Sequence, residues 1–162
     1  TNVHDFPSSE RLVNTSISCV RVARLFGFEP KVAFLSHSTF GKPVSRNTKH
    51  VRDAIELLKT KKVDFDFDGE MQPDVALNPI YQDIYPFSKI VGRANILIMP
   101  ALHSAAISTK LMKVYGDAKL IGPLLIGLGL PIEVAPLRSS TSDILNLASV
   151  AAYSAHVIKY WN

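Results

Sequence analysis

Cysteine is nearly absent from the sequence, which has a single one, Cys19, in 162 residues. A lone cysteine excludes a disulfide framework and a CxxC metal site, and it is compatible with a reducing compartment. No apolar run reaches the ~18 residues that a membrane span needs, and the polar first residues predict no signal peptide. We therefore expect a cytoplasmic protein with no membrane partner. The missing initiator methionine predicts a fragment of a longer chain.

Charge of one sign does not dominate, because 18 basic and 14 acidic residues give a net charge of +4. Nucleic-acid binders more often carry a basic stripe interleaved with aromatic residues, so we expect no nucleic-acid partner. The one basic cluster fits a small anionic ligand or simply a solvated face. It consists of Lys42, Arg46, Lys49, His50 and Arg52. The histidines are dispersed without the spacing of metal ligands on a helix, so we expect no metal site.

Apolar residues make up 47% of the chain and charged residues 20%, as in a globular domain with a buried core. Helical patterns cover residues 9–26, 47–60, 73–78, 104–115 and 141–160. Short apolar or alternating runs predict strands at 31–36, 63–68, 94–99, 120–126 and 132–134. Strands that alternate with helices form βαβ units. We therefore expect an α/β fold with a mostly parallel sheet and helices on both faces.

Two helices carry apolar stripes that predict their buried faces. In the helix over 47–60 the inward residues are Val51, Ala54, Ile55 and Leu58. In the last helix they are Ile144, Ala148, Ala151, Ala155 and Ile158. The small residues in the middle of this second stripe would allow a neighbouring element to approach closely.

The segment from Ser36 to Gly41 follows a predicted strand and is rich in hydroxyl groups. Ligands of open parallel sheets bind at the carboxyl ends of the strands, and hydroxyls with free backbone N–H groups can cradle phosphate there. The segment lacks the first glycine of a Walker loop, so it is no nucleotide motif. A plain polar turn is the alternative interpretation.

Three carboxylates are candidates for chemistry. Asp68 and Glu70 flank a glycine, and they could serve acid–base work or a metal. Alternatively, they form a solvated turn or cap the next helix. Asp143 stands three residues after Ser140, which is the spacing of a capping box. It could instead be a general base, but a helix N-terminus lowers a carboxyl pKa and weakens a base. The residues alone favour the cap.

Five stretches, in order along the chain, resemble those of the phosphate acetyl/butyryl transferases. They are residues 29–41, 68–74, 92–100, 121–127 and 142–144. Within that family the residues of these motifs are most similar to those of the C-terminal phosphotransacetylase-like domain of bacterial NADP-dependent malic enzymes. The residues that carry this closer resemblance are Ser38 to Gly41, Glu70-Met71 and Asn146 to Ala148.

The resemblance implies an isocitrate dehydrogenase-like (phosphotransacetylase) fold, of which this chain is mainly the second domain. Residues 1–135 would form the α/β domain. Residues 136–162 would be a crossover and C-terminal helix that pack toward an absent N-terminal half. The family implies a homodimer or larger homo-oligomer that binds coenzyme A or acetyl-CoA in a cleft.

In the family an aspartate at the start of the last helix takes the thiol proton of coenzyme A, and Asp143 matches it. The family's Ser-Arg pair falls on Pro136 and Leu137, and Arg138 is displaced by one position. The family's asparagine in the 100–107 segment is replaced by Ala106. We therefore expect coenzyme A binding to survive better than acyl transfer. The expected ligand contacts are Ser36, Ser38, Thr39, Gly41, Arg138 and Ser139.

Two functions remain open on this resemblance. In the first, the domain responds to acetyl-CoA and joins subunits of an NADP-dependent malic enzyme. It would hold no cofactor of its own, while NADP and Mg or Mn would bind in the missing N-terminal part. In the second, the domain is an active phosphate acetyltransferase with Asp143 as the base and Arg138 reaching the phosphate. Whether the domain is itself an enzyme stays open.

Overall fold

Three short strands and five α-helices make up the regular structure of the computed structural model, which describes residues 4–116 and 119–161. The strands are β1 (Lys31–Leu35), β2 (Asp66–Met71) and β3 (Ile96–Ile98). The α-helices are α1 (Ser9–Leu25), α2 (Lys49–Thr60), α3 (Pro73–Leu77), α4 (Leu102–Tyr115) and α5 (Thr141–Trp161). Two 3-10 helices, η1 (Arg46–Thr48) and η2 (Pro79–Gln82), complete the list. The chain divides after Ile107 into two compact units, named here the N-terminal and C-terminal units.

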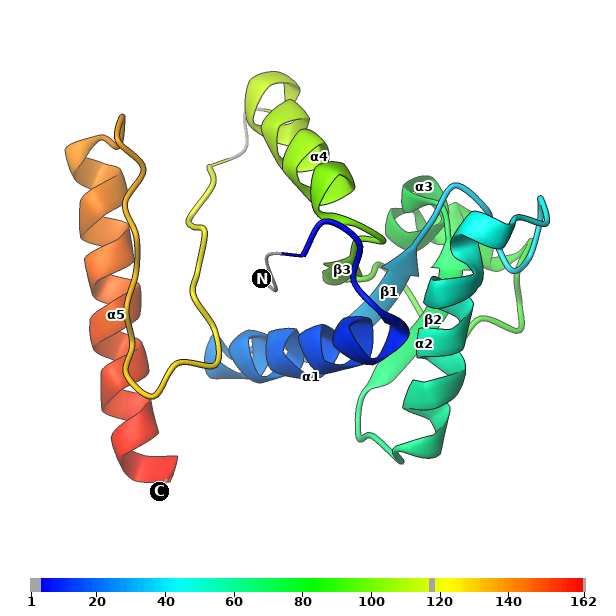
Figure 1. The fold of residues 1–162 in the computed structure, drawn as a ribbon, viewed down its shortest axis with the longest axis horizontal. Helices are drawn as coiled ribbons and strands as arrows, with labels where there is room; N and C mark the ends of the chain where they lie inside the picture. The colour runs from blue at the N-terminus through cyan, green and yellow to red at the C-terminus, as the bar shows by residue number, and fades with distance from the viewer. Residues whose placement is uncertain (1–3, 117–118, 162) are drawn as a thin grey trace. The chain divides into compact units, whose positions relative to one another are not determined.

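The sheet lies in the N-terminal unit and has the order β2-β1-β3, with both pairs parallel. Residues Val32 to Leu35 of the central strand are all buried, because helices cover both faces of the sheet. Val32 and Phe34 pack with α1 and α2 on one face (Figure 1), whereas Ala33 and Leu35 pack with α3 on the other. The expected α/β class with a parallel sheet is confirmed.

Helices α1 and α2 form where the apolar periodicity predicts them. The Ser8 hydroxyl caps α1 by accepting from the Arg11 N–H at 3.3 Å. The buried residues of α2 are Val51, Ala54, Ile55 and Leu58, as its stripe predicts. Together with Leu12, Val13 and Val20 of α1, they build the larger of two core clusters.

Strand β2 begins at Asp66, three residues after the predicted start, and continues to Met71. Its register with β1 shifts once, because Phe34 pairs with Gly69 and Leu35 pairs with Met71. Within the described sheet, Glu70 is therefore the extra residue of a β-bulge. The alternating pattern of 63–68 comes from side chains that pack on the core just before the strand, among them Val63 and Phe65. Pairing with β1, rather than the alternation, decides where β2 begins and ends.

The C-terminal unit differs from the sequence expectation in two places. Residues 120–126 and 132–134 form no strand in the described chain, and Leu124 and Glu133 make an isolated bridge instead. In α5, Leu147 is buried, whereas Ile144, Ala148 and Ala155 are exposed. Apolar residues occur on every side of this helix, so its periodicity does not single out the buried arc. The side chain of Ile158 lies outside the described residues.

Two further expectations concern the whole chain. Within residues 4–116 and 119–161, no helix combines the length and the apolar character required to cross a bilayer. The predicted division after residue 135 is defined by packing against sequence outside this chain, so it stays a prediction.

Gly69 has no room for a side chain, and its substitution is the sharpest test of the sheet. An added Cβ would lie 2.6 Å from the carbonyl oxygen of Phe34, and the φ of Gly69 is +145°. Gly69→Ala is expected to lower the free energy of unfolding by about 2–4 kcal/mol, through the clash and the strained backbone. Urea denaturation followed by circular dichroism measures it.

The matched control is Gly129→Ala, because an added Cβ there would meet nothing within 4 Å. This control is expected to change the free energy of unfolding by less than about 0.5 kcal/mol. Equal losses in the two variants would contradict the close approach of β1 and β2 at Gly69.

Candidate functional site

The carboxyl ends of β1 and β3 open onto a groove of about 820 Å³ in the N-terminal unit. Its walls come from the end of β1, the start of α2 with η1, the turn from β3 into α4, and the residues before α1. The side chains on these walls include Ser36, Arg46, Thr48, Lys49, His50 and His103. This edge is where open parallel sheets bind ligands, as the sequence predicts.

The groove carries positive charge. Arg46 and Lys49 lie at its α2 wall. Asp53 is an acidic residue of the same wall, and its carboxylate is bound to the Lys49 ammonium at 2.5 Å. The Nε2 atom of His50 lies 3.0 Å from the carbonyl oxygen of Pro100, which can only accept, so Nε2 carries the proton. The groove therefore suits a small anionic group such as a phosphate.

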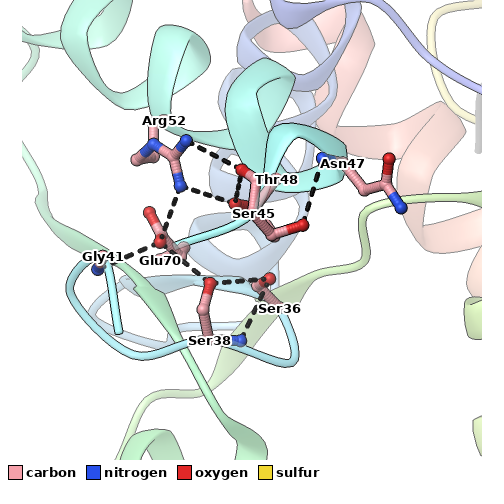
Figure 2. A network of polar contacts seen from close by, with 8 residues as sticks. All are labelled: Ser36, Ser38, Gly41, Ser45, Asn47, Thr48, Arg52 and Glu70. Atoms are coloured by element: carbon pink, nitrogen blue, oxygen red, sulfur yellow. Dashed lines mark hydrogen bonds and ion pairs between the residues drawn. The ribbon is translucent and has the colours of Figure 1, made fainter. Parts of the chain in front are cut away.

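A buried carboxylate stands behind the groove wall. The side chain of Glu70 is 2% exposed, and Figure 2 shows three donors converging on its Oε1 atom. The Ser38 hydroxyl donates at 2.9 Å, the Gly41 N–H at 3.1 Å and the Arg52 guanidinium at 3.3 Å. Burial of a carboxylate is tolerated when charge-assisted hydrogen bonds of this kind surround it.

Arg52 connects this carboxylate to the start of α2. Its Nη1 atom donates to the Thr48 hydroxyl at 2.5 Å as well as to Glu70. Its Nη2 atom donates to the Ser45 carbonyl oxygen at 3.0 Å, and the Ser45 hydroxyl accepts from the Asn47 N–H at 3.2 Å (Figure 2). One ion pair therefore ties the loop after β1 to the first turn of α2.

The four predicted ligand contacts of the N-terminal unit have different surroundings. Ser36 lines the groove. The Ser38 hydroxyl and the Gly41 N–H are bonded to Glu70. The Thr39 N–H donates to the Lys42 carbonyl at 2.8 Å, and its hydroxyl accepts from the Gln72 N–H at 3.1 Å. The loop does present several hydrogen-bond donors, but Ser38 and Gly41 donate to a carboxylate of the chain itself, that of Glu70.

Asp68 and Glu70 do not form the pair that their spacing allows. The Oδ1 atom of Asp68 accepts from the Gly69 N–H at 2.9 Å, and its Oδ2 atom accepts from the Lys89 N–H at 2.8 Å. Asp68 thus shapes the end of β2 and the segment before β3. The solvated-turn interpretation is wrong for Glu70, which the bulge places in the interior.

Asp143 caps α5, as the residues alone favour. Its Oδ2 atom accepts from the Ser140 hydroxyl at 2.8 Å and from the Ser140 N–H at 2.9 Å, while the Ser140 hydroxyl accepts from the Asp143 N–H at 3.2 Å. The hydrogen bond from the Ser140 hydroxyl, then that from its N–H, hold the pKa of Asp143 below its ordinary value. Lys113 and Lys119 lower this pKa further.

The other two predicted contacts, Arg138 and Ser139, also belong to the C-terminal unit. Arg138 is exposed, and the Ser139 N–H closes a turn onto the Pro136 carbonyl oxygen at 3.0 Å. The predicted set is therefore divided between the two units, and its role in binding stays a prediction.

The sequence indicates a basic cluster that includes Arg46, Lys49 and His50 and fits a small anionic ligand or a solvated face, but it does not place these residues among the ligand contacts or identify the partner of Arg52. The signal was present, because Arg46, Lys49 and His50 have the spacing of one helix face at a helix start. Thr48 and Arg52 have the same i,i+4 relation. Nothing in the spacing indicates that Glu70 completes this network from another strand.

The sequence matches the family model described as "Phosphate acetyl/butaryl transferase" over residues 1–152. An NADP-dependent malic enzyme of Rhizobium meliloti (strain 1021) is 45% identical over 155 residues, which are 96% of this chain and 20% of that protein. A phosphate acetyltransferase of Bacillus subtilis (strain 168) is 35% identical over 150 residues, which are 92% of this chain and 46% of that protein. The chain thus spans about a fifth of the first relative and about half of the second.

The fold is likewise shared with solved phosphotransacetylases. The crystal structure of a phosphotransacetylase from Streptococcus pyogenes has a TM-score of 0.88 and 33% sequence identity. The match covers 94% of this chain and 47% of that chain. The phosphotransacetylase fold that the sequence resemblance implies is confirmed.

The lowered pKa of Asp143 makes the stability of α5 sensitive to acid. A carboxyl whose pKa is lower in the folded state stabilises that state above its unfolded value and loses this contribution as the pH falls. The helical circular dichroism signal of α5 should therefore decline as the pH drops below the ordinary carboxyl value of 3.8 and approaches the lowered one. Asp143→Asn should remove this part of the decline, and Asp83→Asn, at an exposed aspartate, should leave it in place.

Proposed function

Because the chain belongs to the phosphate acetyl/butaryl transferase family, we propose that it is the phosphotransacetylase-like domain of a larger NADP-dependent malic enzyme. In this role it binds coenzyme A or acetyl-CoA and makes the parent enzyme, a homo-oligomer of the cytoplasm, responsive to acetyl-CoA. The observation that carries the proposal is the 45% identity to a malic enzyme of which the chain matches only 20%. NADP and a divalent metal would bind elsewhere in that longer protein.

Asp143 and Arg138 both bear on the choice between binding and acyl transfer. An efficient general base has a pKa near the working pH, and a thiol has a pKa of about 8.5. Hydrogen bonds from Ser140 hold the pKa of Asp143 below even its ordinary carboxyl value. The family's aspartate also stands at the start of the last helix, so the feature that favours binding over acyl transfer is Arg138, which is displaced by one position from the family's arginine.

The groove supports the binding of an anionic ligand. Arg46 and Lys49 supply cations to this wall. Hydrogen bonds to charged groups contribute about 1.5–3 kcal/mol each. We assign the phosphate groups of coenzyme A to this wall.

An active phosphate acetyltransferase is the second candidate. It is favoured by the 35% identity to the Bacillus subtilis phosphate acetyltransferase over 92% of this chain. In this alternative Asp143 takes the thiol proton and Arg138 stabilises the phosphate, as the family resemblance implies.

Acetyl-CoA is expected to change the rate at which the full-length protein oxidises malate, and to raise the thermal midpoint of this domain. Arg46→Gln should weaken acetyl-CoA binding about tenfold, since one charge-assisted hydrogen bond is lost. NADPH formation with malate measures the first effect, and titration calorimetry measures the second.

Lys61→Gln is the matched control, because Lys61 is an exposed cation at the opposite end of α2 from the groove. It should bind acetyl-CoA like the unsubstituted protein. A full-length protein that shows neither a rate change nor a thermal shift with acetyl-CoA would refute the regulatory role.

The two functions differ in one reaction, the formation of acetyl-CoA from acetyl phosphate and coenzyme A. We expect the full-length protein to show no sustained release of phosphate in this assay, because Arg138 is displaced by one position from the family's arginine. Sustained turnover that Asp143→Asn abolishes, and Asp83→Asn does not, would establish the alternative.

A further inference from the structure

We propose that the loop of residues 38–41, together with Arg52, is an anion site whose ligand is the chain's own Glu70, and that this internal anion positions both walls of the groove. Glu70 is then a positioning residue, since it is buried behind the wall and does not face the ligand. The part of this inference that concerns ligand affinity rests on the proposed function. The part that concerns the anion site does not.

Three donors surround the carboxylate of Glu70. A hydroxyl, a backbone N–H and a guanidinium, from three separate residues, converge on a single oxygen of Glu70. This is the combination of donors by which proteins bind a phosphate or carboxylate. Gly41 has a φ of +84°, a conformation that glycine adopts readily and that turns the loop back over the carboxylate.

Hydrogen bonds connect the carboxylate of Glu70 to the groove on two sides. On one side, the Ser38 N–H donates to the Ser36 hydroxyl at 3.3 Å, and Ser36 lines the groove. On the other side, Arg52 donates to the Thr48 hydroxyl, and Thr48 also lines the groove. Glu70 therefore stands between two groove walls that come from different parts of the chain (Figure 2).

The carboxylate of Glu70 also sets the direction of two hydroxyl protons. The single hydroxyl proton of Ser38 goes to Glu70, because an ionised carboxylate can only accept. The two hydroxyls of Ser36 and Ser38 are 3.3 Å apart, so in that contact the proton must come from Ser36. The charge of Glu70 thereby sets the orientation of a hydroxyl in the groove.

Removal of the Glu70 charge is not expected to improve anion binding by simple electrostatics. Among the described residues, those that line the groove do not include Arg52. The side chain of Arg52 is 34% exposed, so the charge that it would regain is screened by solvent. Loss of the shaped wall should therefore outweigh any gain in positive charge.

Chemical rescue tests the anion site. Glu70→Ala removes four side-chain heavy atoms that correspond to acetate. We expect acetate to raise the thermal midpoint of this variant by about 2–4 °C at a concentration about five times its Kd. Acetamide, its neutral isostere, should not, and neither should sodium chloride at equal ionic strength. Glu56→Ala, at an exposed glutamate of α2 paired with Lys59, is the matched control and should not respond to acetate.

The same variant tests the positioning role in the full-length protein. We expect Glu70→Ala to weaken acetyl-CoA binding by tenfold or more, and acetate to restore most of it. Unchanged or tighter binding by a folded Glu70→Ala protein would overturn the positioning role. If the unsubstituted protein does not bind acetyl-CoA, the proposed function fails, and the thermal rescue still decides whether the anion site exists.

A double-mutant cycle decides the matter if Glu70→Ala does not fold. Arg52→Gln leaves a buried carboxylate without its cation, whereas Glu70→Gln leaves a partly exposed guanidinium. We expect Arg52→Gln to lower the thermal midpoint more than Glu70→Gln does, and the double variant to be more stable than Arg52→Gln alone. Additive losses in the double variant would overturn the proposal.

Discussion

A carboxylate that is buried away from water needs hydrogen-bond donors from the protein, and the architecture around Glu70 follows from this requirement. The loop after β1 bends so that Ser38 and Gly41 reach one oxygen of that carboxylate. The 3-10 turn η1 and the first turn of α2 are held by the guanidinium that neutralises it. Even the backbone takes part, since the Phe40 N–H donates to the Glu70 carbonyl oxygen at 2.7 Å. The groove is the space that these constrained segments leave open.

This arrangement separates the groups that shape the site from the groups that are available to a ligand. Ser38, Gly41 and Arg52 are engaged within the chain, whereas Arg46 lines the groove. The C-terminal unit has a comparable structural carboxylate, since Asp143 holds the first turn of α5 through its hydrogen bond with Ser140. The carboxylates of Glu70 and Asp143 thus both hold parts of the backbone in place.

The sequence predicts most of the N-terminal unit because each hydrophobic pattern there is compatible with only one kind of element and one buried face. A run of apolar residues such as Val32 to Leu35 fits a strand covered on both faces, and the stripe of α2 fits one buried arc. The C-terminal unit is harder, since α5 is apolar on all sides and periodicity cannot choose between them. That the hydroxyl-rich loop binds an anionic ligand stays a prediction, and the anion that it holds in the structure is a carboxylate of the chain itself. That its anion is Glu70 depends on a register shift between two strands, and no local pattern of residues records such a shift.

The bulge at Glu70 has a consequence for the way β2 divides its side chains. Phe67 belongs to the core cluster on the α1–α2 face, and Met71 belongs to the cluster on the α3 face, although residues four apart in a regular strand share a face. One inserted residue reverses the phase of the strand between them. The inserted residue, Glu70, belongs to neither apolar cluster, so a charged side chain at this position displaces no residue of the core. Selection for a polar function can therefore change this position while both hydrophobic layers stay intact.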